Sequence, residues 1–271
     1  MRVITRHPDL FVGAFITSVL VGLALLSLVW TPLPPAQINI LQRLKPPLEQ
    51  GLLGTDQFGR DMASMLMAGA WNSLSTAFLA VAAGACIGSV LGLLAAAGRD
   101  LLQTVLMRIC DVIFAVPPIL SAMVLGAFLG AGRFTAIIAI GTFMIPVFAR
   151  LTLAGALQIW TRPYVLAAIG MGRSSLKITL GHVLPNISNQ IIVQVTIQLG
   201  LAILTEAGLS FLGLGLAPPA PTWGRMLADA QTFIGQAPWL AILPGAFILI
   251  AVMGFSLLGD GLRDLLDPRS R

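Results

Sequence analysis

SLSTAFLAVAAGACIGSVLGLLAAA, residues 73–97, contains no Asp, Glu, Lys or Arg. An α-helix needs about 20 apolar residues to cross the hydrocarbon core of a membrane, so this stretch can span it. Many of its residues are small, and small residues at helical spacing let helices approach closely in lipid. Gly84, Gly88 and Gly92 therefore predict either a packed position inside a helix bundle or the face of a homodimer.

The rest of the chain has the same character. Of its 271 residues, 57% are hydrophobic and only 10% are charged, which is far from the composition of a soluble domain. We predict an all-α polytopic membrane protein with six transmembrane helices. The expected spans lie near residues 10–30, 73–97, 109–130, 134–156, 187–212 and 239–259. The first is long and lacks a cleavage site, so we expect it to be retained and not removed as a signal peptide.

The basic residues favour an orientation with both termini in the cytoplasm. Of the 16 Lys and Arg residues, that orientation leaves five outside: Arg43, Lys45, Arg60, Arg133 and Arg225. The other eleven are then cytoplasmic: Arg2, Arg6, Arg99, Arg108, Arg150, Arg162, Arg173, Lys177, Arg263, Arg269 and Arg271. The positive-inside rule supports this choice. Because the charges are spread over short loops, the net charge of +5 does not indicate nucleic-acid binding.

A polar stretch interrupts two apolar segments at Tyr164-Val165-Leu166-Ala167-Ala168-Ile169-Gly170-Met171-Gly172 and continues to Leu184-Pro185-Asn186. Pro163 suits the first turn of a helix, which Thr161 could cap. Gly172 can adopt a positive φ, and Ser174 can cap a second short helix that lasts until Pro185. The pattern predicts a cytoplasmic helix, a glycine elbow and a second helix.

The external segment 31–53 is rich in proline and ends on Gly54-Thr55-Asp56-Gln57-Phe58-Gly59-Arg60-Asp61. Thr55 or Asp56 can begin a turn that Gly59 completes, and Asp61 would then stand at the amino end of a helix. The following residues, 62–71, are amphipathic, and we expect them to lie along the outer membrane interface.

Two carboxylates fall in or beside the expected spans. Glu206 lies deep in an apolar helix that also carries Gln190, Gln194 and Gln198 at four-residue spacing. This polar stripe predicts either a lining of the translocation pathway or hydrogen bonds between helices, and both interpretations remain open. Asp111 is a second pathway candidate, or it pairs with Arg108 or Arg99. Bends are expected at Pro117, Pro118 and Pro146.

The sequence offers no catalytic constellation. Neither lysine, Lys45 or Lys177, follows a glycine, so no phosphate-binding Walker motif is present. The only histidines, His7 and His182, cannot form an HExxH zinc site, and Gly208-Leu209-Ser210-Phe211-Leu212 lacks the last glycine of a nucleophile elbow. Cys86 and Cys110 suggest neither a disulfide nor a metal site. We expect no enzyme activity, no metal and no cofactor in this chain.

Several motifs in order resemble one family. They are Leu53-Gly54-Thr55-Asp56-x-x-Gly59-Arg60-Asp61, the stretch 164–186, Glu206-Ala207-Gly208-Leu209-Ser210-Phe211-Leu212-Gly213-Leu214-Gly215, Pro218-Pro219 and Thr222-Trp223-Gly224. Together they are similar to the C-type permease subunits of bacterial ABC importers for dipeptides, oligopeptides and nickel. The resemblance implies a protein of the bacterial inner membrane with a first segment 1–72, a five-helix permease core 73–260 and a tail 261–271.

In that family the stretch 161–186 is the EAA loop, which docks on the ATPase. The resemblance assigns the coupling role to Ala167, Ala168, Gly172, Arg173, Lys177, Leu184 and Pro185. Leu166 stands where the family has its glutamate, so one polar contact to the ATPase is in doubt. Arg173 and Lys177, four residues apart, would share one face toward an acidic partner surface.

The resemblance also implies the partners: a second homologous permease, two ATPase subunits that carry ATP and Mg, and an external solute-binding protein. Peptides are the expected substrate, and nickel or a metal chelate is the alternative. A proton-coupled secondary transporter using Glu206 and Asp111 is the alternative of another class. It would be expected to show paired intramembrane charges and an internal repeat, and the sequence shows neither.

Overall fold

The computed structural model describes residues 8–98 and 100–266. Arg2, Arg6, His7, Arg99, Arg269 and Arg271 lie outside the described residues. Within the described part the chain is helical, without strands, and contains one isolated bridge between Thr55 and Asp61. Its α-helices are α1 (Pro8–Leu26), α2 (Met62–Ala97), α3 (Asp100–Ala115), α4 (Pro118–Leu129), α5 (Arg133–Trp160), α6 (Pro163–Gly170), α7 (Ser175–Ile178), α8 (Leu184–Phe211), α9 (Trp223–Ala230) and α10 (Trp239–Leu266).

Five long apolar helices confirm the prediction of a polytopic helical protein. Each of α1, α2, α5, α7 with α8, and α10 is long enough to cross a membrane. The span expected near 109–130 is different, because it consists of α3 and α4, which meet at an angle of 85°. The break falls at Val116 and Pro117, where two adjacent prolines remove backbone donors. The predicted bend is therefore present, and it is sharp.

The small residues of α2 pack against α5 within the chain. A Cβ atom at Gly88 would lie 2.4 Å from the carbonyl oxygen of Ile145, and one at Gly92 would lie 2.5 Å from that of Ala149. Gly84 is equally close to Met144. This face is occupied inside the bundle, which decides against the homodimer interpretation.

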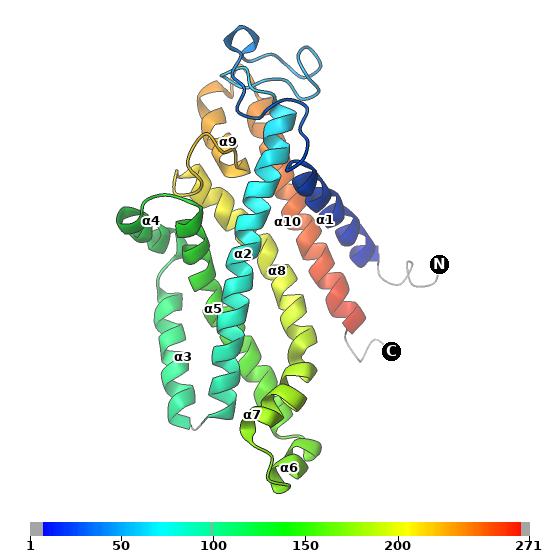
Figure 1. Cartoon of the computed structure of the whole chain (residues 1–271), viewed down its shortest axis with the longest axis vertical. Coiled ribbons are helices and arrows are strands. Elements are labelled where there is room, and N and C mark those ends of the chain that lie inside the picture. Colours follow the sequence, from blue (N-terminus) through cyan, green and yellow to red (C-terminus); the bar gives the residue numbers. More distant parts are fainter. Residues whose placement is uncertain (1–7, 99, 267–271) are drawn as a thin grey trace.

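Helix α2 begins earlier than predicted. Residues 62–71 do not form a separate interfacial helix, because Met62, Leu66 and Ala70 are buried in the main core. At about 1.5 Å per residue, the 36 residues of α2 extend roughly 54 Å, well beyond a hydrocarbon core of about 30 Å. In Figure 1, α2 rises to the loops of residues 31–61 and to α9 at one end of the molecule, while α6 and α7 lie at the other end.

Helix α1 lies against α10 (Figure 1). Gly13 on α1 and Gly261 on α10 allow this close approach, since a Cβ atom at Gly13 would lie 2.3 Å from the backbone nitrogen of Leu258. A Cβ atom at Gly261 would lie 2.4 Å from Cα of Leu10. The first span is therefore packed on the last one by backbone contact.

Candidate functional site

The segment between α5 and α8 has the predicted helix and glycine elbow. Pro163 occupies the first turn of α6, as expected, but Thr161 ends α5 and Arg162 precedes α6 as its N-terminal flanking residue. Gly172 has a φ of +76°, the left-handed region that glycine adopts without steric cost. The Arg173 amide then donates a hydrogen bond to the Ala168 carbonyl at 3.1 Å, which closes the turn.

The prediction that the second short helix ends at Pro185 is wrong. Helix α7 does not stop before Pro185, because a π-helical turn, Thr179–Val183, joins it directly to α8. Pro185 falls in the first turn of α8, where a missing N–H is tolerated. The side-chain amide of Asn186 donates to the carbonyl of His182 at 2.6 Å. The segment after the elbow is thus helical without a break into α8, one of the helices long enough to span a membrane.

A small core of its own holds this segment in place. Val165 and Ala168 of α6 are buried with Ile178, Val183 and Ile187 against Ala156 of α5. Leu93 and Ala96 at the end of α2 pack on the same cluster. Of the predicted coupling residues, Ala168 therefore faces inward, whereas Ala167 is exposed. These contacts join α6 and α7 to α2, α5 and α8.

The surface of α6 and α7 that faces away from this core is apolar and exposed. Leu166 is 56% exposed, Met171 73% and Leu176 69%, and Tyr164, Ile169 and Leu180 are also exposed. A contiguous exposed apolar surface of this kind marks an interaction site when it lies outside the membrane. Leu166, which stands where the family motif has a glutamate, belongs to this surface.

Basic side chains border the same surface. Arg173 and Lys177 line one hollow together with Gly172, Ser174 and Leu180. The two cations do not share a helix face as predicted, because Arg173 precedes α7. Arg173 lies 3.4 Å from Nε2 of His182, whose ring stands 6.1 Å from that of Tyr164 in an edge-on arrangement. Leu184 is half-buried and Pro185 exposed where α8 begins.

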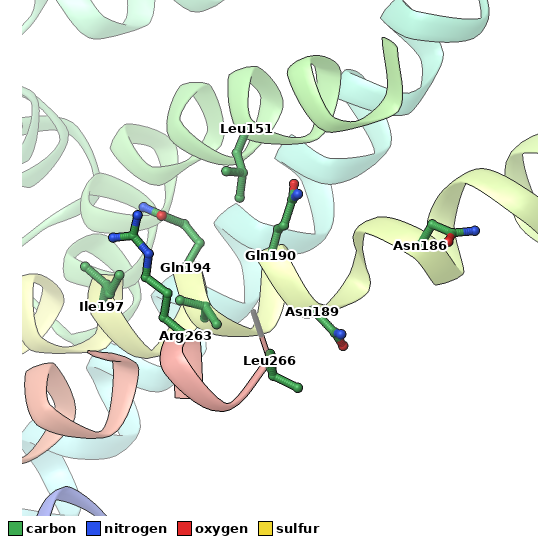
Figure 2. A pocket seen from close by; sticks show the side chains of 9 residues that line it. Leu151, Asn186, Asn189, Gln190, Gln194, Ile197, Arg263 and Leu266 are labelled. Carbon is green, nitrogen blue, oxygen red and sulfur yellow. The ribbon is translucent and has the colours of Figure 1, made fainter. Parts of the chain in front are cut away.

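A cavity of about 550 Å³, lined by both polar and apolar side chains, opens between α5, α8 and the end of α10. Figure 2 shows its lining, in which the side chains of Gln194 and Arg263 point toward one another. Asn186, Asn189 and Gln190 add three amide side chains from two successive turns of α8. Among the described residues that line it, Arg263 is the only charged one. The cavity can hold a polar solute and offers it a cation.

The predicted polar stripe of α8 is divided. Gln190 and Gln194 line the cavity, whereas Gln198 and Glu206 are buried in the bundle. Each step of four residues rotates the side-chain direction around the helix axis by about 40°. Over the 16 positions from Gln190 to Glu206 the rotation amounts to roughly 160°, so the two side chains face nearly opposite sides of the helix. Sequence reasoning missed Asn189 and Arg263. Residues 186, 189, 190, 193, 194 and 197 recur at helical spacing, and this signal could have revealed the cavity face.

Glu206 is enclosed by the protein. Its side chain is 0% exposed, and Ser210 Oγ donates a hydrogen bond of 2.6 Å to Oε1. Ser73 of α2 lies beside the same carboxylate. The position resembles an interhelical polar contact more than the wall of a pathway, so the second interpretation of the sequence fits it better.

Asp111 makes an ion pair away from the cavity. Its Oδ1 lies 2.6 Å from Nη2 of Arg150 on α5, and Arg108 is at 3.7 Å. The Arg150 guanidinium also lies 5.1 Å from the centre of the Phe114 ring. Arg108 was an expected partner, and Arg150 is an additional one that joins α3 to α5.

The motif at residues 54–61, which the sequence predicts to be external, folds into a tight turn. Asp56 is buried, and its Oδ1 accepts hydrogen bonds from the amides of Phe58 at 2.9 Å and Arg60 at 2.8 Å. Its Oδ2 lies 2.6 Å from Nε of Arg60. Gly59 has a φ of +71°, and a Cβ atom there would lie 1.8 Å from the carbonyl oxygen of Asn39. The turn therefore packs closely on Asn39 of the preceding loop.

The other residues of the motif attach this turn to α2. Asp61 precedes the helix, as predicted, and its Oδ2 accepts from the Ser64 amide at 2.8 Å. The Thr55 hydroxyl accepts from the Lys45 amide at 3.0 Å. Gly54 has a φ of +80° and lies against the Lys45 carbonyl. The motif at residues 54–61 therefore fixes the proline-rich loop to the start of α2.

Trp223 anchors the loop between α8 and α9 to the bundle. It is fully buried, and its indole nitrogen donates to the Leu66 carbonyl at 3.1 Å. The Asn72 side chain donates to the Pro221 carbonyl at 2.7 Å. A Cβ atom at Gly224 would lie 2.1 Å from the Ala207 carbonyl oxygen, so the loop also meets α8 by backbone contact.

Comparison with known proteins agrees with this architecture. Residues 88–271 match the family described as "Binding-protein-dependent transport system inner membrane component". The chain is 38% identical over 260 residues to the dipeptide transport system permease protein DppC of Alkalihalophilus pseudofirmus, covering 96% of this chain and 86% of that protein. It is 42% identical to the di/tripeptide transport system permease protein DppC of Pseudomonas aeruginosa, covering 83% and 77%.

A further relative and a solved structure complete the comparison. The glutathione transport system permease protein GsiD of Pectobacterium atrosepticum is 38% identical over 269 residues, covering 99% of this chain and 89% of that protein. The fold resembles the MetNI methionine ABC transporter in an inward facing conformation, with a TM-score of 0.63 and 21% identity. That match covers 75% of this chain and 97% of the other.

Proposed function

The chain belongs to the family of binding-protein-dependent transport system inner membrane components, and we propose that it is the permease subunit through which an ATP-driven importer takes up di- or oligopeptides. The membrane-spanning fold and the family membership establish a transport permease. The peptide substrate is our proposal, supported by relatives named for dipeptide, di/tripeptide and glutathione transport. A nickel or metal-chelate importer is the alternative substrate class.

The observation that carries the coupling role is the elbow at Gly172. Its exposed face, formed by Leu166, Met171 and Leu176, stands on a buried core that ties it to α2, α5 and α8. We propose that an ATPase subunit binds this face and that Arg173 and Lys177 form ion pairs with acidic residues of the same partner. Movement of the elbow would then turn α5 and α8 as one body and change access to the cavity.

The cavity supports this mechanism over proton coupling. Arg263, Gln190 and Gln194 line it, whereas the two candidate proton carriers, Glu206 and Asp111, stand elsewhere. A solute with a carboxylate and peptide groups would find a cation and several amides there. We propose that a second, homologous permease completes the pathway, that two ATPase subunits supply ATP and Mg, and that an external binding protein delivers the peptide.

The test is reconstitution of this chain with its partner subunits in vesicles. Peptide uptake and ATP hydrolysis should both depend on the chain. The double variant Met171→Asp, Leu176→Asp should abolish both, because it places carboxylates on the surface that the ATPase is proposed to bind. Leu41→Asp is the matched control, since Leu41 is 93% exposed in the external loop. Uptake that persists without any ATPase, driven by a pH gradient, would contradict the proposal.

Orientation can be tested separately. We propose that both termini are cytoplasmic, so the elbow is cytoplasmic and the loop of residues 31–61 external. Single cysteines at Leu41 and Met171, in a variant without Cys86 and Cys110, report this with a membrane-impermeant thiol reagent. Leu41→Cys should react in intact cells, whereas Met171→Cys should react only after the membrane is opened. The reverse pattern would invert the topology.

A further inference from the structure

Two opposite charges interact inside the bundle, at the ends of α5 and α8 that are farthest from the elbow. Arg133 is the first residue of α5, and Glu206 lies in the last two turns of α8. At about 1.5 Å per residue, the 28 residues of α5 place Arg133 roughly 40 Å from Trp160, after which the elbow segment begins. The positive charge of Arg133 acts electrostatically on the Glu206 carboxylate.

Glu206 needs this cation because the protein encloses it. Its side chain is 0% exposed, and a carboxylate removed from water requires a counter-charge or hydrogen bonds to remain ionised. Ser210 supplies one hydrogen bond, at Oε1, whereas Oε2 has no hydrogen-bond partner among the described residues. A hydroxyl group can solvate a carboxylate but cannot neutralise it, so the compensating charge comes from Arg133.

Arg133 is only partly satisfied by the rest of the chain. Its Nη2 donates to Ser75 Oγ of α2, while its Nε is buried without a hydrogen-bond partner. The residue begins α5, where the helix dipole disfavours a cation. Neither Arg133 nor Glu206 takes part in the ion pairs that the described residues form. Each of the two therefore depends on the other for charge compensation.

Helix α2 connects the two charges. Ser75 Oγ accepts from Arg133, and Ser73 lies beside the Glu206 carboxylate. The Trp223 amide of α9 donates to Ser73 Oγ at 3.3 Å. The charges thus join α2, α5 and α8 at the end of the molecule that carries α9 (Figure 1), whereas the small core under the elbow joins the same three helices at the other end.

We propose that Arg133 and Glu206 form a mutually neutralising charge pair that fixes α5 to α8 far from the elbow, so that the two helices turn together when the elbow moves. Its role in coupling rests on the proposed function, in which α5 and α8 move as one body. The two partners are unequal, because Glu206 is fully buried and Arg133 is half-buried. Loss of the arginine leaves a carboxylate without access to water, whereas loss of the carboxylate leaves a cation that can extend to the surface.

Thermal unfolding of the full chain, purified with its accompanying subunits, tests the pair. Arg133→Gln should lower the unfolding temperature by about 5 °C or more, because it leaves a buried charge without its partner. Arg133→Lys, which keeps the charge, should lose less, and Glu206→Gln should also have a smaller effect. The double variant Arg133→Gln, Glu206→Gln should be more stable than Arg133→Gln alone, because the second substitution removes the uncompensated charge.

Arg150→Gln is the matched control, because it changes an arginine of the same helix that pairs with Asp111. Its effect should be the same with and without Glu206→Gln. Where Arg133→Gln does not fold, the amount of folded protein after detergent extraction replaces the unfolding temperature, and the double variant should recover it. The charge pair is ruled out if Arg133→Gln is as stable as the wild type, if Glu206→Gln does not rescue it, or if Glu206→Gln rescues Arg150→Gln equally.

Reconstituted vesicles connect the pair to transport. Arg133→Gln should lower the amount of peptide taken up per ATP hydrolysed several-fold, and the double variant should recover part of it, since two amides can still hydrogen-bond to one another. An unchanged ratio in Arg133→Gln would overturn the role of the pair in coupling. Unfolding needs neither peptide nor ATP, so uptake without an ATPase would overturn the proposed function while the rescue experiment still decided on the pair.

Discussion

Ser210 Oγ donates a 2.6 Å hydrogen bond to Oε1 of Glu206, one turn earlier on α8. Both side chains are buried, and Oε2 of the same carboxylate has no hydrogen-bond partner in the part of the chain that the structure describes. An amide at this position keeps an acceptor for Ser210 and cannot carry a proton through the bundle. Replacing Glu206 by glutamine therefore distinguishes a structural role, which the amide preserves, from a proton-carrying role, which it removes.

Glu206→Gln should therefore keep peptide uptake, with the same pH dependence as the wild type. Glu206→Leu should destabilise the protein by about 1–3 kcal/mol, because the buried Ser210 hydroxyl loses its acceptor. Uptake across pH and thermal unfolding in detergent measure the two effects. Loss of uptake in Glu206→Gln, with normal amounts of protein in the membrane, would instead favour proton coupling.

Gly172→Arg should lower uptake several-fold while the protein stays in the membrane. A side chain at a φ of +76° strains the turn, and the added bulk projects into the open space around the elbow, where a partner would bind. Gly235→Arg is the control, because Gly235 is exposed, lies outside the segment 161–186, and has no atom within 4 Å of a Cβ position. Normal ATP-driven transport by Gly172→Arg would remove the elbow from the coupling mechanism.

Gly88→Val should destabilise the bundle by about 1–3 kcal/mol or more, since overpacking forces α2 from α5. The Ile145 carbonyl would lie 2.4 Å from the new Cβ atom. Gly22→Val is the matched control on α1, where no atom lies within 4 Å. The amount of folded protein after detergent extraction measures the difference, and equal amounts for both variants would contradict the close packing.

Arg263→Gln should lower uptake of peptides with a free carboxyl terminus more than uptake of amidated peptides. The reason is that Arg263 supplies the cation of the cavity and faces Gln194 (Figure 2). Competition between the two peptide forms in vesicles measures the preference. Arg43→Gln, in the exposed external loop, should leave it unchanged. An equal loss for both peptide forms would show that Arg263 does not recognise the carboxylate.

The pair of Asp111 and Arg150 should contribute little to stability. Their side chains are 46% and 49% exposed, and exposed ion pairs typically couple by about 0.2–1 kcal/mol. A double-mutant cycle with Asp111→Asn and Arg150→Gln, followed by thermal unfolding, measures this coupling. A much larger value would mean that the pair holds α3 on α5 and is more than a surface contact.

Much of the architecture follows from local composition. A run of about 20 uncharged residues must lie in the membrane as a helix, since unpaired backbone groups are too costly in lipid. Residues 73–97 are helical throughout as part of α2, and Pro117 with Pro118 marks the break between α3 and α4. The elbow follows from Gly172 in the same way, because few other residues adopt its backbone conformation.

The sequence by itself thus determined the membrane helices, the elbow and the resemblance to a permease family. Only the tertiary structure decided which polar residues share a surface. In the structure, Gln190 and Gln194 of α8 line the cavity, whereas Glu206 is buried beside Ser210. Arg263 of α10, about 70 positions later in the chain, points toward Gln194. The physical reason is that helical periodicity sets which face a residue occupies, whereas packing between distant helices decides what that face meets.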